Sequence, residues 1–226
     1  VRGYFEFVDL VTASPDRVKS LEDYLEILHR WTERIQSGPH AIERAIYEVL
    51  AKEYRGSRVA TMELRFNPMK RNLGGERDLD HIIHAALRGM DRACLEYNMK
   101  AGLIFCLARE FPTELNEIIV EKAIRYRSRG VVGIDLAGTE RQRPELDPAS
   151  AERFAGMFER ARDAGLGTTV HTGETPHTAA DGVIAAVERL RPQRIGHGIR
   201  AAYSKEAMDR LREAGVGLEI CPTSNL

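Results

Sequence analysis

The sequence predicts an α/β protein built on a (β/α)8 barrel, and three observations lead to this fold class. Short apolar runs alternate with helical patterns along the 226 residues, which is typical of a parallel sheet covered by helices. Several of the apolar runs end in polar or glycine-rich residues, whereas an open doubly wound sheet gathers its functional residues at one switch point. The G-x-G-x-x-G turn that often marks such an open sheet does not occur.

The first part of the chain is predicted to be mainly helical. Apolar residues recur at helical spacing over 18–35 and 40–54, with Pro15 near the start of the first helix. The first strand follows at 58–68, where apolar side chains alternate with Thr61, Glu63 and Arg65. This alternation favours a strand whose charged face lines a barrel interior near an active site, with a solvated edge strand as the alternative.

The rest of the chain is predicted to alternate regularly between helices and buried strands. A glycine pair at 74–75 forms a turn before the next helix. The predicted helices are 79–97, 114–129, 148–164, 177–190 and 204–214, and the predicted strands are 100–108, 131–138, 168–171, 193–198 and 217–222.

Composition narrows the classes of function. The chain is 43% apolar and 30% charged, with a net charge of -1, so we expect a globular protein that binds neither nucleic acid nor an anionic membrane. No apolar run approaches the roughly 20 residues that span a bilayer. The length suits one domain, 1–226, and the ends at Val1 and Leu226 predict that this domain is truncated on both sides.

The three cysteines bear on the cellular compartment. Cys94, Cys106 and Cys221 are odd in number, far apart and never in a C-x-x-C pair. This pattern indicates free core thiols in a reducing compartment, so we expect a cytoplasmic protein.

The stretch 168–175 is the strongest candidate for a functional site. His171 ends a predicted strand, and Glu174 follows after a glycine-containing turn. This spacing is how an enzyme can place a metal ligand beside a proton donor. A buried histidine hydrogen-bonded at a strand end is the structural alternative.

Five runs at successive strand ends carry a family resemblance. They are Met62-Glu63-Leu64-Arg65-Phe66-Asn67-Pro68, Gly133-Ile134-Asp135-Leu136-Ala137-Gly138-Thr139-Glu140, Val170-His171-Thr172-Gly173-Glu174, Arg194-Ile195-Gly196-His197-Gly198 and Leu218-Glu219-Ile220-Cys221-Pro222-Thr223-Ser224-Asn225. In this order they resemble the adenosine deaminase family of zinc-dependent aminohydrolases.

The resemblance implies a (β/α)8 barrel of which the second to seventh strands are present. It further implies that His171 is a ligand of one Zn²⁺ per subunit and that Glu174 protonates a purine ring nitrogen. His197 would orient and help to deprotonate the zinc-bound water, and Gly138 would hold the purine through its backbone. The implied reaction is hydrolytic deamination of a 6-aminopurine, with adenosine as the first candidate and a small-molecule purine as the only implied partner.

The sequence also departs from the family pattern. The His-x-His pair of the first barrel strand and the aspartate of the eighth, both zinc ligands in the family, are not in this sequence. One imidazole cannot hold zinc tightly, because catalytic zinc ordinarily takes three protein ligands. We therefore expect the parent protein to be an enzyme and this segment alone to be nearly metal-free and inactive.

The substrate and the class of function stay open at this stage. Thr139 and Thr172 stand where the family often has Asp and Ala, so adenine, aminodeoxyfutalosine and N6-modified adenine nucleotides remain alternatives to adenosine. A non-catalytic purine-binding barrel and a different barrel hydrolase are further hypotheses. The cytidine-deaminase zinc pattern, H-x-E with P-C-x-x-C, does not occur.

Overall fold

A computed structural model describes residues 3–14, 16–72, 78–222 and 225. The helix start predicted at Pro15, the turn predicted at 74–75, and Thr223-Ser224 of the last family run lie outside the described residues. The chain divides into two compact units, residues 1–102 and 103–226. Each unit is described by itself.

The first unit is mainly helical. Its elements are α1 (Tyr4–Val11), α2 (Leu21–Ile27), the π-helical segment η1 (Leu28–Thr32), α3 (Glu33–Ile35), α4 (Pro39–Ser57), β1 (Thr61–Phe66) and α5 (Leu79–Tyr97). The helix predicted over 18–35 is thus nearly continuous from Leu21, where the Ser20 hydroxyl accepts the N–H of Asp23 as an N-cap.

Helices α4 and α5 pack closely against each other in the first unit. A side chain at Gly89 of α5 would clash with the backbone carbonyl of Glu43 in α4, so only glycine allows this approach. Both helices bury an apolar stripe and expose charged residues on the other side, as their helical periodicity predicted. Ile42, Leu50, Ile82 and Ile83 are at most 2% exposed.

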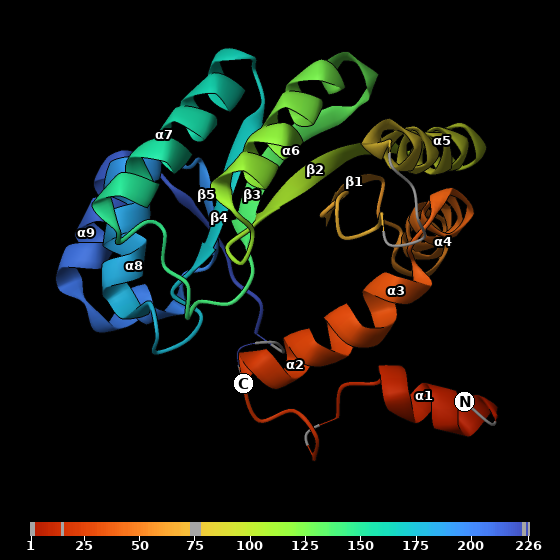
Figure 1. Ribbon diagram of the computed structural model, residues 1–226, viewed down its shortest axis with the longest axis horizontal. Helices are drawn as coiled ribbons and strands as arrows, with labels where there is room; N and C mark the ends of the chain where they lie inside the picture. Colours follow the sequence, from red (N-terminus) through yellow and green to blue (C-terminus); the bar gives the residue numbers. More distant parts are fainter. Residues whose placement is uncertain (1–2, 15, 73–77, 223–224, 226) are drawn as a thin grey trace. The chain divides into compact units, whose positions relative to one another are not determined.

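The second unit contains a parallel sheet covered by helices. Its strands are β2 (Lys100–Ala108), which begins in the first unit, β3 (Val131–Ala137), β4 (Gly167–Thr172), β5 (Arg194–His197) and β6 (Gly217–Glu219). Its helices are α6 (Thr113–Arg125), η2 (Arg127–Arg129), α7 (Pro148–Asp163), α8 (Ala179–Ala185), η3 (Ala186–Leu190), η4 (Ile199–Tyr203) and α9 (Lys205–Ala214). Each strand from β2 to β6 pairs in parallel with the next along the chain, and Figure 1 shows α6, α7 and α8 outside the strands.

The core of the second unit lies between this sheet and its helices. The strands β2 and β3 are almost continuously apolar, whereas β4 is rich in buried threonine. Phe105, Ile134 and Val170 are completely buried. Phe158 of α7 is also 0% exposed. Burying each such side chain stabilises the fold by about 1.5–3 kcal/mol, which keeps the strand ends in fixed register.

That register brings the chemically interesting strand ends to one edge of the sheet. Asp135 pairs with Thr169, His171 with Gly196, and Thr172 with His197. Because neighbouring parallel strands end at the same edge, side chains from β3, β4 and β5 can meet there.

The last strand is shorter than predicted. The prediction of 217–222 was wrong because β6 ends at Glu219, whose partner in β5 is Gly196. The neighbouring strand turns at His197, where φ is 64°, so the ladder has no strand partner further on. Ile220 is 51% exposed and Cys221 is exposed as well, so the interpretation of all three cysteines as core thiols was wrong for Cys221.

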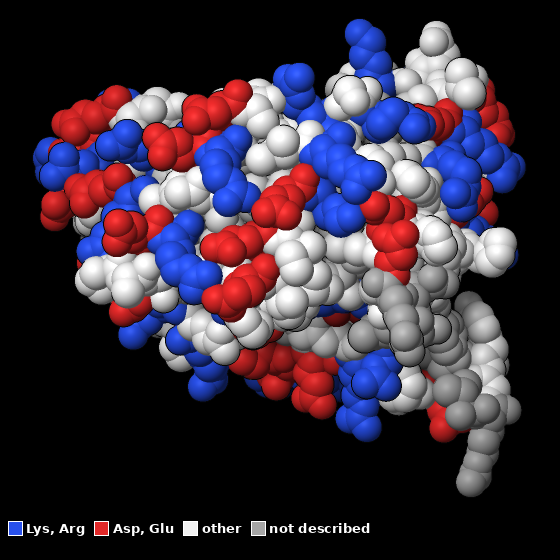
Figure 2. All heavy atoms as spheres, turned by 45° about the horizontal axis from the view of Figure 1, so that its top comes forward, with Lys and Arg blue, Asp and Glu red and all other residues white. Residues whose placement is uncertain are grey.

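Charged side chains of both signs are mixed on the surface. Figure 2 shows Lys and Arg interspersed with Asp and Glu on the face that it presents. Within the described residues, no helix combines the length and the apolar character needed to cross a bilayer.

Candidate active site

His171 lies near the end of β4, beside a buried carboxylate from β3. Its Nδ1 is 3.0 Å from Oδ1 of Asp135, and Asp135 is 0% exposed. A neutral imidazole in this pair donates its Nδ1 proton to the carboxylate, so a metal or substrate would be met by Nε2. Gly196 on β5 gives the ring its space, since a Cβ there would lie 3.0 Å from two of its atoms.

His197 ends β5 and faces the same edge. Its ring centroid is 5.4 Å from that of His171, well within the roughly 10 Å over which two imidazoles can share one small ligand. Its backbone is left-handed, with φ at 64°, which is costly for a residue other than glycine and recurs at functional sites. The amide Nδ2 of Asn225 is 2.9 Å from its Nδ1, so this amide favours the tautomer with the proton on Nε2.

Glu174 follows β4 in a turn and reaches back to His197. One of its carboxylate oxygens, Oε2, lies 3.5 Å from Nε2 of His197, and its side chain is 14% exposed. Burial raises the pKa of this carboxyl to about 7, with a further increase from the charge of Glu140 and an opposing effect from His171. At neutral pH a large fraction of Glu174 therefore carries the proton that a general acid needs.

Gly138 lies in the turn directly after β3, where only glycine fits. Its φ is 108°, and a side chain would clash with the carboxylate of Glu110 and lie 3.3 Å from the backbone nitrogen of Arg109. Gly138 comes directly after β3, the strand that contains Asp135. That it holds a purine remains a prediction.

The structure adds residues that the sequence analysis did not single out. Asp135 orients His171, and its signal was a carboxylate inside an otherwise apolar strand. Glu140 accepts hydrogen bonds from the turn that carries Glu174. Arg109 and Glu145 form an ion pair at 2.5 Å with both side chains 0% exposed, and no local sequence pattern announces a pair 36 residues apart.

Comparison with known proteins decides the family. A family profile described as "Adenosine deaminase" matches residues 6–226. The chain belongs to the adenosine deaminase family. An adenosine deaminase from Vibrio atlanticus is 33% identical over 212 residues, which are 94% of this chain and 60% of that protein. The chain thus spans about 60% of this curated relative.

Two solved structures of related proteins have the same fold. An amidohydrolase from Burkholderia ambifaria, described with bound Zn, matches with a TM-score of 0.81 and 26% identity over 96% of this chain and 57% of its own. The Arabidopsis protein ADAL, crystallised with IMP, matches with a TM-score of 0.76 and 26% identity over 98% and 62%. The predicted incomplete barrel fold and the resemblance to the adenosine deaminase family are thereby confirmed.

The adenosine deaminase family is metal-dependent, which raises the question of whether the described residues fit a metal. Catalytic zinc takes three protein ligands. In the ranges that the structure describes, no three His, Cys, Asp or Glu side chains are grouped so that they could hold an ion. His171, oriented by Asp135, suits one ligand position, but these residues do not fit a complete zinc site.

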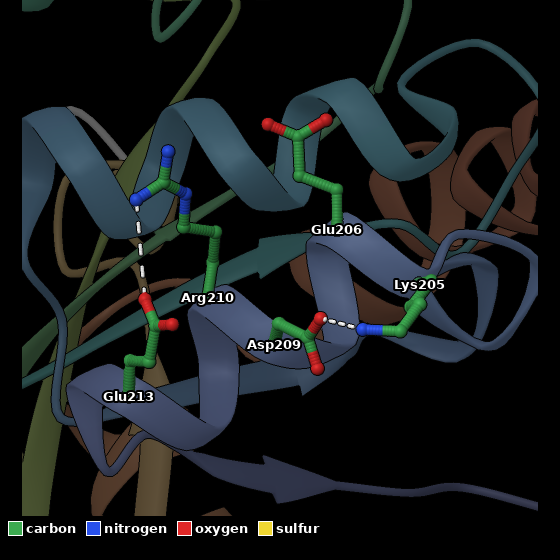
Figure 3. Close-up of a pocket in the computed structure, with 5 residues that line it drawn as sticks. All are labelled: Lys205, Glu206, Asp209, Arg210 and Glu213. Atoms are coloured by element: carbon green, nitrogen blue, oxygen red, sulfur yellow. Dashed lines mark hydrogen bonds and ion pairs between the residues drawn. The ribbon is translucent and has the colours of Figure 1, made fainter.

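The site at the strand ends is distinct from a hollow on α9. That hollow, of about 440 Å³, is lined by Lys205, Glu206, Asp209, Arg210 and Glu213. Figure 3 shows Lys205 joined to Asp209 and Arg210 joined to Glu213. Because both cations of this hollow are paired with carboxylates of the same helix, the hollow offers no chemistry comparable with that of the strand-end site.

Proposed function

We propose that this chain carries the purine-binding and proton-donating part of an enzyme that hydrolyses the amine from a 6-aminopurine. The observation that carries the proposal is the meeting of Glu174 and His197 at 3.5 Å, beside the Asp135–His171 pair. Adenosine is the first candidate substrate, supported by the 33% identity to an adenosine deaminase.

Glu174 supplies the acid that the reaction needs. When a water oxygen adds to the ring carbon that bears the amine, electron density moves onto the adjacent ring nitrogen. A carboxylic acid that is still protonated near pH 7 can deliver a proton to that nitrogen. The pKa of Glu174, raised to about 7 by burial, suits this role, which an ordinary exposed glutamate could not fill at neutral pH.

His197 and His171 have different parts in the proposal. With Asn225 at its Nδ1, His197 presents an N–H at Nε2, which orients an oxygen lone pair. Accepting a proton at Nε2 requires the other tautomer. His171, fixed by Asp135, is the ligand that this chain contributes to the metal.

Zinc is the metal that we propose for the complete site, one ion per subunit. The proposal is supported by the related amidohydrolase with bound Zn. Zinc lowers the pKa of water to about 7 and so makes a nucleophile available at neutral pH. No step above is derived through the ion, because the described residues do not by themselves complete its site.

The test is an amine-release assay on the purified protein that carries this chain. It measures ammonia released from adenosine, adenine, aminodeoxyfutalosine and AMP, and methylamine released from N6-methyl-AMP. We expect turnover of one or more of them, and loss of at least 100-fold in kcat for Glu174→Gln. Glu152→Gln, at an exposed position of α7, is the matched control and should retain activity. Inert purines, or full activity of Glu174→Gln, would contradict the proposal.

A further inference from the structure

Glu140 is a buried carboxylate to which the proposed chemistry assigns no part. It lies two residues after Gly138 and is 1% exposed. Its Oε1 accepts the backbone N–H of Glu174 at 3.0 Å. Its Oε2 accepts the backbone N–H of Thr175 at 2.6 Å and the hydroxyl of Thr175 at 2.5 Å. One side chain from the loop after β3 therefore binds two consecutive amides in the turn after β4.

We propose that Glu140 is a positioning residue whose carboxylate fixes the backbone of the Glu174–Thr175 turn and so places the Glu174 carboxyl in the site. The proposal rests on the acid role given to Glu174 above. Because Glu140 binds the N–H of Glu174 itself, a shift of the turn moves the acid with it. A displacement of about 1 Å at such a group can reduce the rate by roughly 100-fold.

The hydrogen bonds of this turn divide into local and long-range ones. Gly173, with φ at 69°, donates its N–H to the hydroxyl of Thr178 at 2.9 Å. That bond is made within the segment after β4. The next two amides instead depend on Glu140, 34 and 35 residues away. The position of the acid is therefore coupled to the loop after β3, which also contains Gly138.

The negative charge of Glu140 supports the acid role of Glu174, as do its hydrogen bonds to the turn. After burial, the negative charge of Glu140 is the next cause that raises the pKa of Glu174. His171 lowers this pKa, and His197 faces the same carboxyl at 3.5 Å. A residue that positions the acid thus also favours its protonated form.

Two variants separate position from charge. Glu140→Gln keeps the shape but removes the charge and turns an N–H group toward amides that need an acceptor, whereas Glu140→Asp keeps the charge but shortens the reach. In the metal-loaded protein we expect kcat for its best 6-aminopurine to fall by about 10- to 100-fold in both variants, with KM within about threefold. In the plot of kcat against pH, the alkaline limb should move to lower pH only in Glu140→Gln, because this variant alone loses the charge that raises the pKa of Glu174.

Glu152→Gln is the matched control for these profiles. Unchanged kcat and an unchanged limb in Glu140→Gln would overturn the proposal, as would a loss confined to KM. If Glu140→Gln does not fold, Thr175→Ala removes one of the three hydrogen bonds, and we expect a loss in kcat of about two- to fivefold. A Thr175→Ala variant with the wild-type kcat would then contradict the positioning role of Glu140.

A second measurement on the 226-residue chain needs neither substrate nor metal. Hydrogen exchange followed by NMR should be at least about tenfold faster for the amides of Glu174 and Thr175 in Glu140→Gln, with the amides of β3 unchanged. Unchanged exchange at both amides would overturn the positioning role. If exchange responds but the wild-type protein deaminates no 6-aminopurine, the proposed function fails while Glu140 still positions the turn.

Discussion

At the scale of single residues, Glu174 is costly to ionise in the folded protein. Its pKa is raised from 4.5 to about 7 by burial and then by Glu140. Between pH 4.5 and about pH 7, Glu174 therefore keeps a proton in the folded state that it releases in the unfolded state. The resulting stabilisation is complete below about pH 4.5 and is lost as the pH rises through about 7.

We therefore predict that Glu174→Gln stabilises the protein at alkaline pH. Relative to wild type, the free energy of unfolding should increase by about 1–3 kcal/mol between pH 5 and pH 8, because glutamine cannot ionise. Urea denaturation at both values measures this difference. Glu152→Gln should show no such pH dependence, and a difference that shrinks toward pH 8 would contradict the prediction.

Two substitutions at His197 test whether the backbone is strained at this position. Its φ of 64° is tolerated by asparagine but is unfavourable for a β-branched residue. We predict that His197→Val is less stable than His197→Asn by about 1–3 kcal/mol in thermal or urea unfolding. Equal stability of the two variants would show that the backbone relaxes at this position.

At the scale of elements, the loop between β3 and α7 is fixed by a buried ion pair. Arg109 donates to the carboxylate of Glu145 at 2.5 Å, to the carbonyl of Gln142 at 3.2 Å and to the carbonyl of His171 at 2.6 Å. A residue at the end of β2 therefore connects the loop after β3 with the end of β4. The loop that presents Gly138 and Glu140 is positioned in this way.

We predict that Arg109→Met destabilises the protein by about 3–5 kcal/mol, because Glu145 is left buried without its cation. The double variant Arg109→Met/Glu145→Met should recover part of this loss, since it removes the uncompensated charge. Arg153→Met breaks a comparable pair with Glu114 whose side chains are 45% and 65% exposed, and it should cost less than about 1 kcal/mol. Urea unfolding compares all three variants, and a double variant that is no more stable than Arg109→Met would contradict the argument.

At the scale of the whole molecule, β2 belongs to both compact units. Within the first unit, Lys100 donates to the carbonyl of Ala60, and within the second, Leu103 donates to the carbonyl of Gly130. That residues 1–226 form one domain stays a prediction.

Trp31, the only tryptophan, makes the prediction testable. It lies in the first unit, so its fluorescence reports that unit, whereas far-ultraviolet circular dichroism reports both. If the chain unfolds as one domain, the two signals should have coincident midpoints in urea. Separate midpoints would show that the units unfold independently.

How much the sequence could predict differs between these scales. Apolar periodicity predicted the order of helices and strands, because it reflects which faces are buried. Motifs at strand ends singled out His171, Glu174 and His197, which the structure brings to one edge. The predicted length of β6 was wrong because the end of a strand depends on the strand beside it. The neighbouring β5 turns away at His197, and the pairing of β5 with β6 stops at Glu219.

The sequence by itself determined the alternation of strands and helices, the family, and the residue types available for proton transfer. The tertiary structure alone decided which distant groups meet: Asp135 with His171, Glu140 with the amides of Glu174 and Thr175, and Arg109 with Glu145. The physical reason is that periodicity and turn chemistry act over a few residues. The proton affinity of Glu174, by contrast, depends on burial and on a charge 34 residues away, which only the folded chain brings close.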